Sequence, residues 1–228
     1  MTGASSKADR FAAIQAGRLE GLRSRVRELL SPTGDERALD VGTGTGALAF
    51  ALAPLVREVV GVDVDATMLE RAREDAPPNV ELRVADGERL PFAAGSFDLG
   101  STLRSLHHTP APDLVLAELA RVVRPGGTLL VADQLAPDDR AAAEELNRFE
   151  RARDGSTSTV LAIGDLRALF AKNGLAVVRE EVTRAPRELE RYLDLAGCEG
   201  AERERARALA PSGYEDVTGW FVLRKPVP

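Results

Sequence analysis

The chain contains little cysteine, little histidine and few aromatic residues. Its 228 residues include one cysteine, two histidines and 4% aromatic side chains. The single cysteine, Cys198, cannot form an internal disulfide bond, so we expect a reducing, cytoplasmic setting. Residues 1–10 are polar and lack the apolar core of a signal peptide. No apolar run approaches the roughly 20 residues that a membrane helix needs, so we expect no membrane partner.

A long basic stretch and a metal-ligand pattern are also missing. The 36 Asp and Glu residues outnumber the 30 Lys and Arg residues, which gives a formal net charge of −6. This balance argues against nucleic acid as a partner. Two adjacent histidines cannot readily face one ion, and no Cys/His ligand spacing is present, so we expect no metal. The 44% hydrophobic content is ordinary for a globular protein, and the length suits a single α/β domain.

Strand-like and helix-like segments alternate along most of the chain. This alternation predicts a mostly parallel, doubly wound α/β sheet, with the first helix as a cover. Asp165 is a plausible N-cap and Gly174 a stop signal, and residues 154–159 read as a flexible loop. The expected strands are 37–41, 58–62, 80–84, 97–102, 128–133, 175–183 and 217–224. The expected helices are 7–30, 46–53, 66–75, 111–123, 137–153 and 165–173, and residues 186–209 are mainly helical.

The most informative segment is a glycine-rich turn that follows the first expected strand. Residues 38–46 read Ala-Leu-Asp-Val-Gly-Thr-Gly-Thr-Gly. Tight turns need glycine for structural reasons alone, so this motif by itself is a weak signal. Its glycines alternate, whereas the dinucleotide fingerprint leaves two residues before its third glycine. The spacing favours a ligand with an uncharged ribose and an amino-acid tail, such as S-adenosylmethionine (SAM).

Two carboxylates end the next two expected strands. Ligands of open α/β sheets lie beyond the carboxyl ends of the strands, where Asp63 could accept hydrogen bonds from two ribose hydroxyls. The alternative is that Asp63 caps the following helix, a role that Asp65 fills equally well. Asp86 could accept from the adenine amine, with Val64 and Leu90 on either side of the ring. Its alternative role is an ordinary turn aspartate.

Five segments together carry a resemblance to a known family. They read Leu-Asp-Val-Gly-Thr-Gly-Thr-Gly, Val-Val-Gly-Val-Asp, Ala-Asp-Gly-Glu-Arg-Leu-Pro-Phe, Ser-Phe-Asp and Arg-Val-Val-Arg-Pro-Gly-Gly. In this order and spacing, the chain resembles class I SAM-dependent methyltransferases. The branch it most resembles is the small-molecule group that includes ubiquinone/menaquinone-type and natural-product enzymes. The resemblance runs from about residue 38 to residue 133 and fades across 136–228.

The resemblance implies a fold, a domain plan and a cofactor site. The fold would be a Rossmann-like seven-stranded sheet with six parallel strands and an antiparallel last strand. Residues 1–228 would form one domain, with a helical cover (1–34), a SAM-binding core (35–135) and a substrate-side insertion with the last two strands (136–228). The cofactor would be SAM and the product S-adenosylhomocysteine. The implied cofactor-binding residues are Asp40, Gly42, Thr43, Gly44, Gly46, Asp63, Val64, Met68, Asp86, Gly87, Thr102 and Leu103; for Met68, core packing is the stronger alternative.

The two histidines are the candidates for acid–base chemistry. His107 and His108 follow the fourth expected strand, and Asp133 ends the fifth, so all three open onto the same edge of the sheet. A histidine of near-neutral pKa can remove a proton as the methyl group arrives, and an aspartate can orient it. We expect His107 to be the better candidate, although either histidine could simply pack or cap. This pairing favours an oxygen acceptor over carbon, and carbon over nitrogen.

Two features of the second half bear on the acceptor. Related enzymes often carry Arg-Asp-Pro-Ser-His where residues 153–157 read Arg-Asp-Gly-Ser-Thr, so a role for that histidine is absent or transferred. The aromatic residues could form pocket walls or, more ordinarily, core: these are Phe149, Tyr192, Tyr214 and Trp220. The expected partner is a small organic acceptor, and the protein would be a monomer or homodimer.

Two other functions stay open at this point. One is a SAM-binding relative with non-methylating chemistry or a pure binding role, which could keep every cofactor residue. The other is an NAD(P)-dependent oxidoreductase, which the glycine spacing and the Asp86 motif disfavour.

Overall fold

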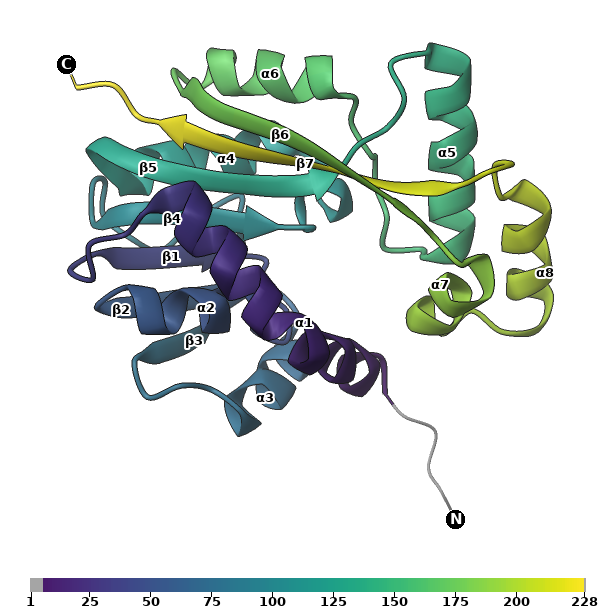
Figure 1. Ribbon diagram of the computed structural model, residues 1–228, viewed down its shortest axis with the longest axis horizontal. Helices are drawn as coiled ribbons and strands as arrows, with labels where there is room; N and C mark the ends of the chain where they lie inside the picture. Colours follow the sequence, from purple (N-terminus) through teal and green to yellow (C-terminus); the bar gives the residue numbers. More distant parts are fainter. Residues whose placement is uncertain (1–5, 228) are drawn as a thin grey trace.

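Seven strands form one sheet in the order β3-β2-β1-β4-β5-β7-β6 in the computed structural model, which describes residues 6–227 (Figure 1). The last strand, β7, runs antiparallel to both of its neighbours, and the other strands pair in parallel. The predicted sheet of six parallel strands and one antiparallel last strand is therefore confirmed. The strands are β1 (Arg37–Val41), β2 (Glu58–Asp63), β3 (Val80–Val84), β4 (Phe97–Leu103), β5 (Val123–Gln134), β6 (Ala176–Pro186) and β7 (Glu215–Arg224).

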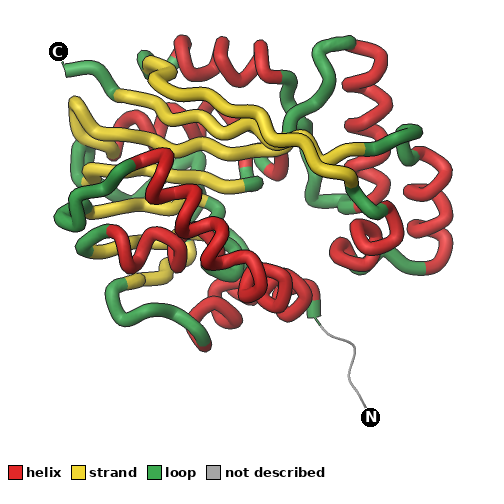
Figure 2. The backbone as a smooth tube through the Cα atoms, in the orientation of Figure 1, coloured by secondary structure: helices red, strands yellow, loops and turns green. Residues whose placement is uncertain are grey.

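Helices cover both faces of the sheet (Figure 2). One apolar core joins the sheet to α4 and α6, and a second joins the opposite face to α1 and α2. The sheet is thus doubly wound, as predicted, with strands buried from both sides. The helices are α1 (Lys7–Leu30), α2 (Ala47–Leu52), α3 (Ala66–Glu74), α4 (Pro112–Val122), α5 (Arg140–Arg153), α6 (Ile163–Lys172), α7 (Leu189–Ala196) and α8 (Gly200–Leu209), with short 3-10 helices η1 (Ala53–Leu55) and η2 (Leu106–His108).

Helices α5, α7 and α8 form a separate lobe beyond the carboxyl ends of β5 and β6 (Figure 1). This lobe has its own apolar cluster, which includes Phe149, Tyr192 and Leu193. Helix α1 crosses the sheet and reaches this lobe with its amino-terminal half. Helix α1 therefore contacts both the sheet layer and the lobe.

Local signals place most element boundaries close to their predicted positions. Ser6 caps α1 in a capping box with Asp9, and Ser31 ends the helix in a left-handed conformation just before Pro32. Pro112 begins α4, at the position where a missing N–H costs nothing. Gly174, at φ +66°, follows α6 as the expected stop.

Several boundaries differ from the prediction, and strand β6 continues to Pro186, past its predicted end at residue 183. Strand β5 begins at Val123, and its pairing with β4 skips from Val123 to Thr128, so the Pro-Gly-Gly segment bulges within the strand. Helix α5 begins only at Arg140, because Asp139 is its N-cap. Helix α6 begins earlier, after Ala162, so the N-cap prediction for Asp165 was wrong. The predicted helical stretch 186–209 is divided between α7 and α8 at Gly197, which has φ +75°.

Charged side chains are buried inside the lobe. The Glu150 carboxylate, 1% exposed, accepts from Arg153 Nε at 2.9 Å and from Gln134 Nε2 at 2.7 Å. It also accepts from the hydroxyls of Tyr192 and Tyr214. Because each lone pair is occupied, the buried charge is compensated.

The described part of the chain, residues 6–227, contains no helix that is both long and apolar enough to cross a membrane.

Replacing Glu150 with alanine should destabilise the fold strongly. The change would leave the Arg153 guanidinium buried without its carboxylate, a loss of about 3–5 kcal/mol in the free energy of unfolding. The matched control is Glu145→Ala, at an exposed position of the same helix, which should change that energy by less than about 0.5 kcal/mol. Urea unfolding of both variants measures the difference. Equal effects would show that the buried network contributes nothing to stability.

Candidate active site

The glycine-rich turn after β1 is tied to the end of β2. The backbone N–H groups of Gly42 and Thr43 donate to the Val62 carbonyl at 2.9 and 3.0 Å. Gly42, Gly44 and Gly46 have φ angles of +69°, +55° and +92°, in the left-handed region that favours glycine. The three glycines of the motif are therefore required by the backbone.

Space around the three glycines differs. A Cβ atom on Gly42 would lie 1.8 Å from Ser105 Oγ, and one on Gly46 would lie 2.5 Å from the Phe50 ring. A Cβ atom on Gly44 would meet no described atom within 4 Å. Packing thus explains the first and third glycines, whereas Gly44 lies beside open space. The Gly42–Ser105 contact also brings the glycine turn against the residue that precedes the histidines.

Asp63 faces the glycine turn from the end of β2. Its Oδ2 accepts from the Gly44 N–H at 2.8 Å, and its Oδ1 accepts from the Asp65 N–H at 2.9 Å. The N-cap of α3 is Asp65, whose carboxylate accepts from the N–H groups of Thr67 and Met68. The capping alternative for Asp63 is thus taken by Asp65. Each Asp63 oxygen keeps a lone pair for further hydrogen bonds.

Asp40 and Thr43 are buried at this turn. Ser101 Oγ donates to Asp40 Oδ1 at 2.9 Å. Burial raises the pKa of Asp40 to about 7, although the hydrogen bond from Ser101 and the nearby Thr43 act to lower it. A buried carboxyl of this kind supports the turn from below; it offers little surface to a ligand.

The end of β4 leaves part of its backbone without a strand neighbour. Pairing between β1 and β4 ends at Asp40 and Ser101, whereas pairing between β4 and β5 continues to Leu103 and Ala132. On the β1 side, Thr102 and Leu103 therefore extend past the described ladder. Strands β1 to β3 extend from the β1–β4 pair toward one edge of the sheet, and the later strands extend toward the other edge. Such a reversal of strand order is the usual ligand position in these folds.

Apolar side chains flank Asp63 on its other side. Val64 is 68% exposed and Val84, at the end of β3, is 58% exposed. Leu90, which we expected against the second face of an adenine ring, is buried in the core. Val84 is thus an exposed apolar residue at this edge that sequence reasoning missed, although its place as the last residue of a predicted strand was a usable signal.

The remaining cofactor candidates occupy the same edge of the sheet. Asp86 is exposed, and its carboxylate accepts from the Glu88 N–H at 2.9 Å in an ordinary turn. A Cβ atom on Gly87 would lie 2.7 Å from Val41, so this glycine packs against β1. Met68 is half-buried in the first turn of α3. Together with the open space at Gly44 and the carboxylate of Asp63, these residues fit a nucleoside with a short polar tail.

His107 is held by a buried carboxylate. Its Nδ1 lies 2.5 Å from Asp133 Oδ1, and its backbone N–H donates to Asp133 Oδ2 at 3.1 Å. The charges of His107 and Arg104 hold the pKa of Asp133 below its usual value although burial opposes this. The structure therefore brings together the predicted pair of His107 and Asp133. His107 is 6% exposed, and Leu106 and Thr159 lie around it and Asp133.

His108 lies beside His107 and is an exposed residue. The two ring centroids are 4.1 Å apart. Ser156 Oγ lies 3.1 Å from His108 Nδ1, and it donates to Asp154 Oδ1 at 2.6 Å. Desolvation of the ring and the adjacent His107 lower the pKa of His108 to about 4, so this ring is neutral at pH 7.

The loop after α5 closes over both histidines. The N–H groups of Ser158 and Thr159 donate to the His107 carbonyl at 2.8 and 3.2 Å. Lys7 Nζ, at the start of α1, pairs with Asp154 Oδ2 at 3.0 Å. The segment that we expected to be a flexible loop is thus attached to both the cover helix and η2. Thr157, at the position where related enzymes carry a histidine, is buried.

Helix α1 also contacts the glycine turn directly. Thr45 Oγ1 donates to Gln15 Oε1 at 2.5 Å. Arg104, which follows β4 in the left-handed conformation at φ +51°, pairs with Asp216 of β7 at 3.0 Å. Sequence reasoning missed Gln15 and Arg104, because neither lies in a recognisable motif.

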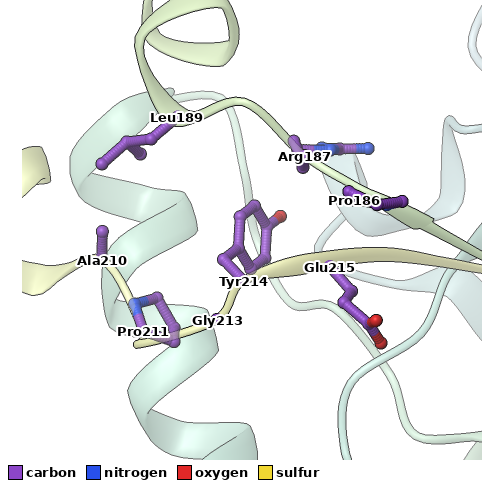
Figure 3. Close-up of a pocket in the computed structure, with 8 residues that line it drawn as sticks. All are labelled: Pro186, Arg187, Leu189, Ala210, Pro211, Gly213, Tyr214 and Glu215. Carbon is purple, nitrogen blue, oxygen red and sulfur yellow. The ribbon is translucent and has the colours of Figure 1, made fainter.

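The aromatic residues proposed as pocket walls are mainly core. Phe149 and Tyr192 are buried in the lobe, and Trp220 packs in the core beneath α1. The exception is Tyr214, whose ring borders a cavity of about 450 Å³ together with Arg187 and Pro211. In Figure 3 the Tyr214 hydroxyl points toward Arg187. This cavity belongs to the lobe, away from the carboxyl ends of β1, β2 and β4.

Within residues 6–227, no three His, Cys, Asp or Glu side chains are grouped so that they could hold a metal ion.

Comparison with known proteins agrees with this geometry. Residues 39–131 match a family model described as a methyltransferase domain. The chain is 31% identical over 175 residues to the uncharacterized methyltransferase YcgJ of Bacillus subtilis (strain 168), which covers 75% of the chain and 69% of YcgJ. It is 32% identical over 165 residues to the O-methyltransferase rstn1 of Aspergillus nomiae, covering 70% of the chain and 72% of that protein. Four other curated relatives are longer, and the chain spans 37% to 59% of their length.

Solved structures share the fold. The crystal structure of YcgJ superposes with a TM-score of 0.80 at 23% identity, covering 92% of this chain and all of that one. The [4+2]-cyclase SpnF superposes with a TM-score of 0.73 at 21% identity, covering 92% of this chain and 81% of that one. The motif series, the sheet order and the relationship to YcgJ agree. This chain belongs to the class I SAM-dependent methyltransferase family.

Proposed function

We propose that the protein transfers a methyl group from SAM to an oxygen atom of a small organic acceptor. The observation that carries the proposal is the position of the Asp63 carboxylate. It accepts a hydrogen bond from the Gly44 N–H and lies beside the open space at Gly44, at the carboxyl ends of the strands. The histidine pair at the neighbouring strand ends supports oxygen as the acceptor atom. The relative rstn1 is named as an O-methyltransferase, which also supports an oxygen acceptor.

The chain's own residues would bind and align the reactants. SAM, when bound, supplies a methyl group on a sulfonium that is already activated for displacement. Asp63 would accept from the two ribose hydroxyls, and Val64 and Val84 would contact the adenine ring. The backbone at the end of β4, at Thr102 and Leu103, would bind the methionine ammonium. Alignment of the acceptor with the methyl group would supply most of the rate enhancement.

The histidine pair would take the proton that an acceptor hydroxyl loses. In this step the oxygen–carbon bond forms, the sulfur–carbon bond breaks, and the hydroxyl proton passes to an imidazole nitrogen. His107 has a carboxylate that orients its ring and stabilises its charged form. His108 is the more exposed residue of the two. Helix α1 and the loop after α5 would cover the site and exclude water.

A non-methylating function is the principal alternative. SpnF, described as a [4+2]-cyclase, has the same fold, so the fold is compatible with other chemistry. Incubation with SAM carrying a labelled methyl group and a panel of phenols, sugars and hydroxylated polyketides separates the two. We expect labelled product from at least one acceptor. SAM binding without transfer to any oxygen, nitrogen or carbon acceptor would favour the alternative.

The setting proposed for the protein follows the sequence prediction. Its one thiol, Cys198, is buried and free, which suits a reducing, cytoplasmic environment. The acceptor is proposed to be its main partner.

Replacing Asp63 with alanine should weaken SAM binding at least about tenfold, because two hydrogen bonds to a charged group are lost. Isothermal titration with SAM measures the change. Asp65→Ala is the matched control: it removes the N-cap of α3, lowers the free energy of unfolding by about 1 kcal/mol, and leaves the SAM dissociation constant within threefold. If both variants bind SAM equally well, Asp63 has no role in the cofactor site. Tight NADH binding without SAM binding would instead indicate an oxidoreductase.

Replacing Gly44 or Gly42 with alanine should separate an effect on SAM binding from an effect on folding. Gly44→Ala places a methyl group in the open space, so we expect SAM affinity to fall at least about tenfold, with a loss of about 1–2 kcal/mol in stability from the positive φ. Gly42→Ala collides with Ser105 and should lose about 1–3 kcal/mol more. Gly34→Ala, at φ +100° in open space at the other end of β1, controls for backbone strain. SAM affinity unchanged in Gly44→Ala would refute the placement of the ligand.

Replacing His107 with alanine should lower kcat by about 10²–10⁴-fold, because the change removes either the base or the ring against which His108 packs. The SAM dissociation constant should stay within threefold. Steady-state kinetics with the acceptor found in the labelling screen tests this, and Asp133→Asn should lower kcat in the same direction. A turnover within threefold of the unmodified enzyme would remove His107 from the mechanism.

A further inference from the structure

A serine hydroxyl joins His108 to a carboxylate in the loop after α5. Ser156 Oγ lies 2.6 Å from Asp154 Oδ1 and 3.1 Å from His108 Nδ1. The Ser156 backbone N–H donates to the same Asp154 oxygen at 3.0 Å. The other Asp154 oxygen accepts from Lys7 Nζ at 3.0 Å. The carboxylate is therefore fixed from two sides, and the hydroxyl is fixed by the carboxylate.

The single proton of the hydroxyl decides which nitrogen of His108 is protonated. Two oxygens only 2.6 Å apart need a proton between them. Burial alone would raise the pKa of Asp154, but the bonds from Ser156 and Lys7 hold it well below its usual range, so the carboxylate is ionised and accepts. The Ser156 proton therefore points to Asp154, and Oγ can only accept from His108. His108 must carry its proton on Nδ1.

We propose that Asp154 and Ser156 are positioning residues that hold His108 as the Nδ1–H tautomer, so that its Nε2 lone pair receives the proton of the acceptor hydroxyl. The arrangement parallels the pair of Asp133 and His107, with a serine inserted between the carboxylate and the ring. The part that concerns proton transfer rests on the proposed function, whereas the tautomer follows from the hydrogen bonds alone.

Burial assigns different roles to the two histidines. His107 is 6% exposed, and the loop after α5 is hydrogen-bonded to its carbonyl. His108 is exposed, and its ring packs on that of His107. A base must come within hydrogen-bond reach of the hydroxyl it deprotonates. His108 is therefore the ring that meets the acceptor, and His107 with Asp133 supports it.

Nitrogen-15 NMR of histidine-labelled protein tests the tautomer directly, since only two imidazoles contribute signals. Spectra at pH 7.5 need neither SAM nor acceptor, and His107→Ala assigns the signals. We expect the Nδ1–H pattern for His108 in the unmodified protein. In Ser156→Ala, His108 should change to the Nε2–H form that an unconstrained neutral histidine favours, while His107 is unchanged. Ser156→Thr, which keeps the hydroxyl, should restore Nδ1–H.

The matched control is Ser158→Ala, two residues along the loop, since Ser158 contacts His107 through its backbone N–H. It should leave both tautomers unchanged. Asp154→Asn is a second variant, expected to change the His108 tautomer as Ser156→Ala does. An Nε2–H form of His108 in the unmodified protein, or an unchanged tautomer in both Ser156→Ala and Asp154→Asn, would overturn the proposal.

Kinetics connects the positioning by Asp154 and Ser156 to turnover. Ser156→Ala should lower kcat at least about tenfold, with the SAM dissociation constant and the acceptor KM within threefold, and Ser156→Thr should recover activity. A changed tautomer with unchanged kcat would overturn the role of His108 as base. Failure of the enzyme to methylate any acceptor, with the Nδ1–H tautomer present, would overturn the proposed function and leave the positioning by Asp154 and Ser156 intact.

Discussion

The hydrogen bonds from the Gly42 and Thr43 N–H groups to the Val62 carbonyl are the constraint on which the site depends. They bend the chain after β1 across the end of β2. This brings the Gly44 N–H to the Asp63 carboxylate and places Gly42 against Ser105, the N-cap of the short helix η2 that carries both histidines. A side chain at Gly42 would push these parts away from one another. The proposed cofactor site and the histidines are thus adjacent because one turn is tight.

The loop after α5 joins three parts of the molecule that are distant in sequence. Lys7 of the cover helix reaches Asp154, the N–H groups of Ser158 and Thr159 reach His107, and the buried pair of Arg153 and Glu150 anchors the loop in the lobe. Closure of the cover and orientation of the histidine rings therefore depend on the same few residues. This coupling gives a physical reason for a polar, glycine-containing segment to be well packed.

The parts of the site that lie in the glycine and carboxylate motifs were predictable, because their spacing along the chain reflects local backbone geometry. Alternating glycines demand positive φ angles, and an acidic residue at a strand end faces the sheet edge. The pairing of His107 with Asp133 was also predictable from two strand ends that open on one side. The helix that we expected from Asp165 begins at Ile163 instead, with Ala162 as its N-cap. Leu90 is buried in the core, a burial that the sequence did not predict.

Composition, strand–helix alternation and the motif series determined the fold class, the methyltransferase family and the edge of the sheet that carries the candidate site. These properties depend on periodicity and short-range spacing, which a sequence displays directly. Only the tertiary structure decided which histidine is buried, which valines are exposed, and that Ser156 reaches His108 across 48 positions of the chain. Such contacts depend on how the lobe and the loop pack on the sheet, and no local pattern in the sequence encodes that packing.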